Sequence, residues 1–96
     1  MNIERKIAER SLKVKGFIKD KSKDHVFYRF CFKGREAHAY TYFSHSKKIK
    51  TVTMGLIHQM QKQLRLDTPQ EVFDLLTCPM SERDYISKLK SKGELR

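Results

Sequence analysis

The segment His25-Val-Phe-Tyr-Arg-Phe-Cys-Phe-Lys-Gly-Arg-Glu-Ala-His-Ala-Tyr-Thr-Tyr-Phe-Ser-His45 contains seven of the ten aromatic residues of the chain. Apolar side chains alternate along its first half with polar or mixed ones, which is the period of two expected of a β-strand. Gly34 can take a positive φ angle, so we place a turn at Lys33-Gly34-Arg35. The segment therefore predicts a β-hairpin whose return strand runs from Ala37 to Phe43.

The alternation gives the first strand of this hairpin two different faces. The uniformly apolar face is expected to lie against helices, and it consists of Val26, Tyr28, Phe30 and Phe32. The mixed face should meet water or a ligand. Exposed aromatic side chains such as Phe27, Tyr40 and Tyr42 can stack on nucleic-acid bases, but more often such residues are buried. We expect at least Tyr40 or Tyr42 to be buried.

Helical patterns flank the hairpin on both sides. Apolar residues recur at helical spacing from Ile3 to Leu12, with Asn2 as a possible N-cap, and a short extended segment follows Gly16. A second helix is expected to start near Thr51 or Thr53. Thr68-Pro69-Gln70-Glu71 is typical of a capping box at the start of a third helix. Ser81, followed by Asp84, opens a fourth helix in the same way.

This order predicts an α+β fold made of a helix, a three-stranded antiparallel sheet and a second helix, with both helices on one sheet face. The double-stranded-RNA-binding domain (dsRBD) has this order of elements. We expect residues 1–66 to form this dsRBD-like core, and residues 67–96 to add two C-terminal helices packed on the same domain.

The charge of the chain is strongly positive, with 21 Lys and Arg against 11 Asp and Glu and a net charge of +10. From Ala37 through Leu66 there is no acidic residue, so the positive charge there is uncompensated. Such a charge favours an anionic partner, most often nucleic acid and sometimes a membrane surface or an acidic protein. A protein that is merely basic is the alternative that this pattern leaves open.

The remaining composition argues against several classes of protein. Cys31 and Cys78 show no CxxC or Cys/His spacing, and the four histidines are not paired at ligand spacing, so we predict no metal site and no cofactor. A single disulfide is possible. No signal peptide and no apolar run of membrane-spanning length is visible, which favours a cytoplasmic protein with no membrane partner and reduced thiols.

The order of residues resembles the HicA family of toxin ribonucleases. That family has a basic loop, Gly-Ser-His, an apolar strand, a Gly-Arg turn, a strand that ends in a histidine, and a lysine-rich segment before a helix. The corresponding residues here are Lys21-Ser22-Lys23-Asp24-His25, Gly34-Arg35 and His45-Ser46-Lys47-Lys48-Ile49-Lys50. The resemblance covers about residues 3 to 65, and Lys23-Asp24 stands where the family has Gly-Ser.

The resemblance implies metal-independent cleavage of RNA, as in the mRNA interferases of toxin–antitoxin systems. It carries the family's histidine over to His25 as general base or acid, with Arg29 on the same strand face to steady the scissile phosphate. The candidates for contact with the RNA backbone are Lys21, Lys23, His45, Lys47, Lys48 and Lys50.

Three functions follow as expectations. The first is a HicA-like endoribonuclease that an antitoxin protein holds inactive. The second is a non-catalytic RNA-binding module on the same fold, and the third is a protein-interaction module in which the extra helices dock a partner. The sequence leaves the RNA target, the antitoxin and the oligomeric state open.

Overall fold

The computed structural model describes residues 2–46 and 48–95. The predicted hairpin consists of β3 (His25–Phe32) and β4 (Arg35–Ser44), which pair antiparallel. Lys33 and Gly34 form its two-residue loop with φ angles of 52° and 77°, and two positive values are typical of the turns that match the twist of a hairpin. A further strand, β2 (Phe17–Lys21), pairs with β3 and completes a three-stranded antiparallel sheet in the order β2-β3-β4.

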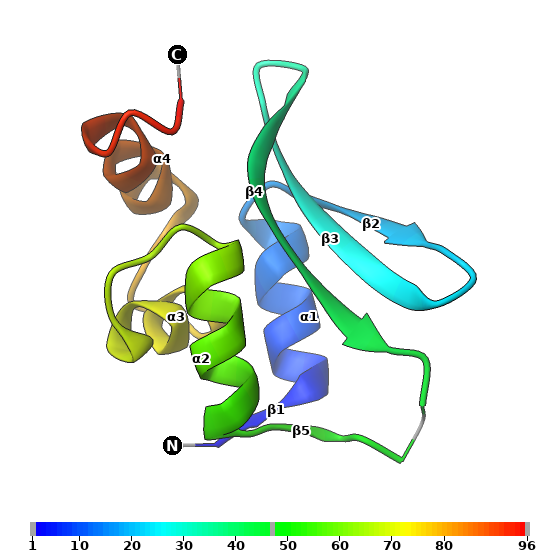
Figure 1. Cartoon of the computed structure of the whole chain (residues 1–96). Helices are drawn as coiled ribbons and strands as arrows, with labels where there is room; N and C mark the ends of the chain where they lie inside the picture. The colour runs from blue at the N-terminus through cyan, green and yellow to red at the C-terminus, as the bar shows by residue number, and fades with distance from the viewer. Residues whose placement is uncertain (1, 47, 96) are drawn as a thin grey trace.

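A second, much smaller sheet joins the start of the chain to the segment after the hairpin (Figure 1). Its strands are β1 (Ile3–Glu4) and β5 (Thr51–Val52), with Ile3 opposite Val52. The prediction of Asn2 as helix cap is therefore wrong: α1 (Arg5–Val14) begins after β1, and the Arg5 N–H donates to the carbonyl of Lys50 at 2.8 Å. Strand pairing thus satisfies a backbone group that a cap would otherwise serve.

One face of the three-stranded sheet packs on α1 and on α2 (Met54–Gln63) (Figure 1). The alternation predicted for β3 is confirmed here, since Val26, Tyr28 and Phe30 are buried, although Phe32 is only half-buried. The buried hydroxyl groups on this face bond to the helices. The Tyr28 hydroxyl donates to Glu9 of α1, and the Thr41 hydroxyl donates to Gln63 of α2.

The C-terminal segment adds α3 (Pro69–Leu76) and α4 (Glu82–Ser91), each of which begins with the capping box that the sequence predicts. Their apolar side chains belong to the same hydrophobic core as the sheet. The ring of Tyr85 lies 5.0 Å from that of Phe30 and 5.6 Å from that of Phe17, and its hydroxyl donates to the carbonyl of Leu64 at 2.7 Å. Burial of this hydroxyl raises the pKa of Tyr85.

Two polar side chains, one in α1 and one directly after it, hold the end of α3. Lys15 is only 7% exposed, and its ammonium group donates to the carbonyls of Leu75 and Thr77 at 2.8 Å each. The Ser11 hydroxyl donates to the same two carbonyls. The last carbonyls of a helix lack partners within the helix, so these contacts stabilise the terminus. Burial lowers the pKa of Lys15.

The described residues thus form an α+β fold in which helices pack on one face of a three-stranded antiparallel sheet. Among these residues, no helix has both the length and the apolar character that crossing a membrane requires.

Candidate nucleic-acid interface

A hollow of about 670 Å³ lies where the start of α1, the end of β2 and the segment after β4 meet. We call it the basic hollow, because most of its polar lining is cationic or basic. Two glutamates, Glu4 and Glu9, also line it. The basic side chains that line it are Arg5, Lys6, Lys19, Lys21, His45 and Lys50.

Arg5 gives the hollow its shape by tying α1 to the segment that follows the sheet. Its guanidinium donates to the backbone carbonyls of Ser44 at 2.6 Å, Ser46 at 3.2 Å and Ile49 at 3.3 Å. Ser44 ends β4, whereas Ser46 and Ile49 belong to no helix or strand, and their carbonyls would otherwise rely on water for hydrogen bonds. One side chain therefore fixes the backbone on which His45 and Lys50 are carried.

Glu9, one of the two glutamates that line the hollow, is paired with neighbouring side chains. Glu9 accepts a hydrogen bond from the Nε of Arg5 at 3.2 Å, and its other oxygen accepts one from the Tyr28 hydroxyl. Burial, together with this hydrogen bond to Glu9, raises the pKa of Tyr28. Glu9 and Arg5 together carry no net charge, so the positive field of the hollow comes from the surrounding lysines.

His45 closes one side of the hollow. Its Nε2 lies 2.6 Å from the carbonyl oxygen of Ser22, so this nitrogen carries the proton and donates. Ser22 belongs to the turn between β2 and β3, where its hydroxyl donates to the carbonyl of His25 at 2.9 Å. The histidine thus connects the turn before β3 to the segment after β4.

The sheet face that points away from the helices, which we call the open face, carries a cluster of aromatic rings. His25 lies 4.5 Å from Tyr42 between ring centroids, Phe27 lies 5.4 Å from Tyr42, and Phe27 lies 6.5 Å from Tyr40. All four side chains are half-buried, and Ile18 beside them is 57% exposed. The expectation that Tyr40 or Tyr42 would be buried is wrong, because the described helices cover the opposite face.

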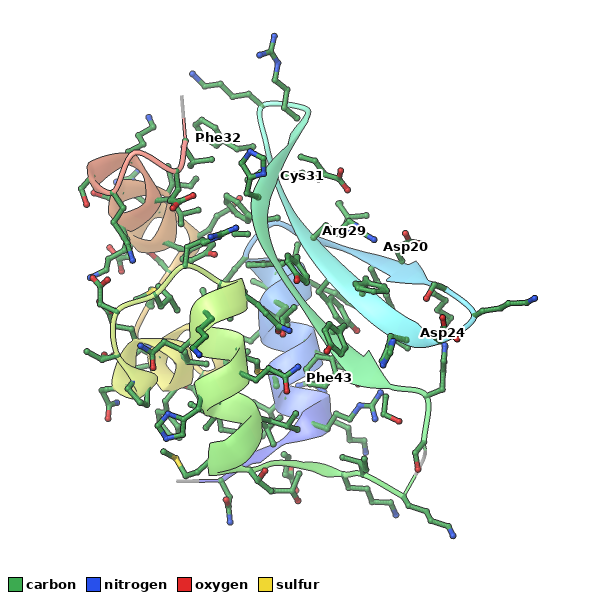
Figure 2. The ribbon with its side chains drawn as sticks, in the orientation of Figure 1. Asp20, Asp24, Arg29, Cys31, Phe32 and Phe43 are labelled. Carbon is green, nitrogen blue, oxygen red and sulfur yellow. The ribbon has the colours of Figure 1, made fainter. Side chains whose placement is uncertain are left out.

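Arg29 lies opposite Tyr40 in the strand register and already has partners, among them Asp20, which is labelled beside it in Figure 2. Its guanidinium is 4.7 Å from the centre of the Phe27 ring, and its Nε is 3.5 Å from Glu36 and 3.8 Å from Asp20. A phosphate that approached Arg29 would compete with two carboxylates for the same guanidinium.

The structure brings some of the predicted site residues together and separates others. Lys21, His45 and Lys50 all line the basic hollow, whereas Lys23 and Lys48 are exposed outside it. Lys47 lies outside the described residues.

The two histidines that the sequence singles out point to opposite faces of the sheet. His25 packs on Tyr42 on the open face, while His45 lines the hollow together with the helix-facing Val26. The register explains this separation, since His25 lies opposite Ser44 and the next residue points the other way.

Sequence reasoning did not find Arg5, Lys6, Lys19 and Glu9 as part of a site. Lys19 had a usable signal, because it shares its strand face with Lys21. Arg5 had none, since its carbonyl partners lie far away in the sequence and accept through their backbones.

Within residues 2–46 and 48–95, no group of three or more histidine, cysteine or acidic side chains is arranged to hold a metal ion. Cys31 and Cys78 do not form a disulfide with each other. Comparison of the chain with protein-family models, curated proteins and solved structures gave no match in any of the three. The function of the chain is therefore inferred from the chemistry of the hollow and of the open face.

Proposed function

We propose that this chain is an RNA-binding protein that resembles the HicA toxin ribonucleases, and that the basic hollow holds the phosphate backbone of the RNA. The observation that carries the proposal is the convergence of basic side chains from α1, β2 and the segment 45–50 on one hollow. Lysine and arginine that neutralise phosphates release counterions from the RNA, and this release drives binding. The net charge of +10 supports the same proposal.

The arrangement of the elements supports a dsRBD-like fold as part of this proposal. A helix precedes a three-stranded antiparallel sheet, a second helix follows it, and α1 and α2 pack on the same sheet face. The short strands β1 and β5 and the helices α3 and α4 are additions to the order that the resemblance implies. A fold of this kind hosts more than one activity, so the site has to carry the functional argument.

Binding of a fluorescent RNA of mixed sequence, followed by anisotropy at several salt concentrations, tests the proposal. The double variant Lys21→Ala/Lys50→Ala removes two cations from the hollow and should weaken binding. A plot of log affinity against log salt concentration has a negative slope, and the magnitude of this slope should fall by about 1 to 2, because two phosphate contacts are lost.

A matched control removes the same charge elsewhere. Lys13 lies in the last turn of α1 and Lys90 in the last turn of α4, and neither lines the hollow. Lys13→Ala/Lys90→Ala should keep the slope of the wild type. Equal losses in both double variants would show that RNA responds only to net charge, and the hollow would then not be the binding site.

RNA cleavage at His25 is a second proposal, which one observation favours. His25 starts β3 at the end of the sheet where the basic hollow lies, opposite Ser44 and therefore one residue from His45. A phosphate held in the hollow would leave the neighbouring nucleotide near this end of the open face. Imidazole is suited to proton transfer near neutral pH, and the proposed reaction uses no metal.

Cleavage is tested by expressing the wild type and His25→Ala in a bacterial host and by incubating each purified protein with RNA in the presence of a chelator. We expect growth arrest and RNA loss with the wild type alone. Equal growth with intact RNA in both cultures would exclude catalysis and leave the RNA-binding proposal standing. His38→Ala, which changes an exposed histidine in the first half of β4, is the control.

A further inference from the structure

The open face carries four aromatic side chains in one contiguous cluster, on a surface that the described helices leave uncovered. The rings follow one another as His25, Tyr42, Phe27 and Tyr40, with neighbouring centroids 4.5 to 6.5 Å apart. The first proposal above uses none of these rings to bind RNA. We propose that this cluster is a stacking platform for unpaired RNA bases, so that the substrate is single-stranded RNA. This inference rests on the proposed RNA binding and names the class of RNA.

The rings are held in place but keep part of their surface free. Tyr40 and Tyr42 follow each other on the same face of β4, about 7 Å apart along the strand. The hydroxyl of Tyr42 accepts a hydrogen bond of 2.9 Å from the side chain of Gln59, which fixes the ring without burying it. Stacking of a base on such a ring costs the protein little conformational entropy, because the ring is already oriented.

The charges next to the rings suit a base and do not suit a phosphate. Arg29 lies over Phe27, but Asp20 and Glu36 flank its guanidinium, so this group of three carries more negative than positive charge. A phosphate would be repelled there, whereas the face of an uncharged base would not. The basic hollow has the opposite character, with lysines from α1, β2 and the segment 45–50. The open face is therefore suited to the bases of the RNA, and the basic hollow is suited to its phosphates.

The two surfaces are also continuous. Tyr42 is two residues before the end of β4, and His45, which lines the hollow, is the first residue after that strand. A strand of RNA whose phosphates occupy the hollow can turn its bases over the end of the sheet onto Tyr42 and Phe27. Bases in a duplex stack on one another and offer no free face, so this arrangement requires unpaired nucleotides.

The spectroscopic test uses the tyrosines of the full chain. The protein has no tryptophan and four tyrosines. Two of these, Tyr28 and Tyr85, are buried. Tyrosine fluorescence thus reports largely on Tyr40 and Tyr42 when RNA binds. An oligouridine of about twelve nucleotides should quench this fluorescence in a saturable way, and a blunt RNA duplex of the same length should not. Uridine monophosphate at equal absorbance corrects for light absorbed by the RNA.

Affinity measurements distinguish the contribution of the aromatic ring to RNA binding from the contribution of the positive charges. Tyr40→Ala should weaken binding of the oligouridine about tenfold with an unchanged salt slope, because it removes a stacking surface and no cation. Tyr40→Phe keeps the ring and should bind like the wild type. Binding of the duplex should be the same for all three proteins.

The outcomes distinguish this inference from the proposed function. If oligouridine binds through the hollow lysines but Tyr40→Ala has wild-type affinity and the wild type shows no quenching, the RNA binds in the hollow alone and the stacking platform is wrong. The open face would then be free to dock a protein partner. If no RNA binds at low salt, the proposed function and this inference are both wrong. Quenching in the wild type decides the matter even if Tyr40→Ala fails to fold.

Discussion

The guanidinium of Arg5, at the first position of α1, donates a hydrogen bond of 2.6 Å to the backbone carbonyl of Ser44, at the last position of β4. This contact joins the start of α1 to the end of β4, next to the segment that lines the basic hollow. The same guanidinium reaches two further carbonyls and Glu9, and it lies 5.1 Å from the ring centre of Phe43. Arg5 is therefore a structural residue of the hollow as well as a positive charge within it.

Replacement of Arg5 by methionine should lower the free energy of unfolding by about 2 kcal/mol, because backbone carbonyls around the hollow lose a charged donor. Urea denaturation followed by circular dichroism measures the change. Lys6→Met is the matched control, since Lys6 is the next residue, is exposed and lines the same hollow. It should alter stability by less than about 0.5 kcal/mol. Equal midpoints for the two variants would contradict the role assigned to Arg5.

Lys15→Met should lower the free energy of unfolding by about 1 kcal/mol near neutral pH, since the end of α3 loses a charged donor while the hydroxyl of Ser11 stays. The pKa of Lys15 is lowered by burial, so the unfolded chain binds its proton more readily than the folded one. Stability from this group therefore rises as pH increases towards its usual pKa of about 10.

The difference in stability between the wild type and Lys15→Met should accordingly widen as pH rises from about 8 to about 10. Thermal melts over this range provide the measurement. Lys13→Met changes an exposed lysine in the last turn of α1, two residues earlier, and should show a constant difference. A gap that stays constant or narrows as the pH rises would mean that burial does not lower the pKa of Lys15 in the folded protein.

Acid sensitivity should depend on Lys88. Hydrogen bonds from Lys92 and then from Lys88 lower the pKa of Asp67. Burial alone would raise the pKa of Glu71, but the hydrogen bond from Lys88 and those from backbone N–H groups outweigh it and lower this pKa. Carboxyl groups with a depressed pKa stabilise the fold above the pKa of the unfolded chain, and this contribution is lost as the pH falls.

We therefore expect the wild type to lose stability as the pH falls from about 5 to about 3, and Lys88→Met to lose less over the same range. Urea midpoints at each pH are the measurement. Lys90→Met, whose ammonium group lies over the ring of Phe32 and has no carboxylate partner among the described ion pairs, should follow the wild type. Parallel curves for the wild type and Lys88→Met would show that Lys88 does not cause the loss of stability at low pH.

Gly34→Ala should destabilise the hairpin by about 1 kcal/mol, because a side chain disfavours its φ angle of 77°. An added Cβ at Gly34 would meet no atom within 4 Å, so the cost lies in the backbone alone. Gly55→Ala is the contrasting control. Gly55 is helical and an added Cβ would be 3.9 Å from Thr53, so alanine there should stabilise α2 by up to about 1 kcal/mol. Two changes of equal sign in thermal melts would refute this assignment of the turn.

Local patterns predicted much of the fold. The alternation of Val26, Tyr28 and Phe30, the turn at Gly34 and the capping boxes at Thr68 and Ser81 each depend on residues within a few positions of one another. The sequence fails where distant segments meet. Two-residue strands such as β1 and β5 have no periodicity to detect, and their pairing places the start of α1 two residues later than a cap at Asn2 would.

The sequence likewise predicted some features of the candidate site and missed others. The basic segment that starts at His45 and the aromatic residues of the hairpin were visible in the sequence, because both are runs of one residue type. That Tyr40 and Tyr42 stay partly exposed depends on which sheet face the helices cover, and the pattern of β4 alone did not decide this. The carbonyl partners of Arg5 act through the backbone, and a backbone acceptor leaves no mark in the sequence.

The pairing of β1 with β5 has a consequence for the order in which the molecule assembles. The hairpin of β3 and β4 joins neighbouring residues and can form early, whereas β1 and β5 join opposite halves of the sequence at the cost of closing a long loop. With only two residues in each strand, this pair should also be among the first to open and to exchange its amide protons. The basic hollow lies against it, so we expect this hollow to be completed last during folding and to open before the core does.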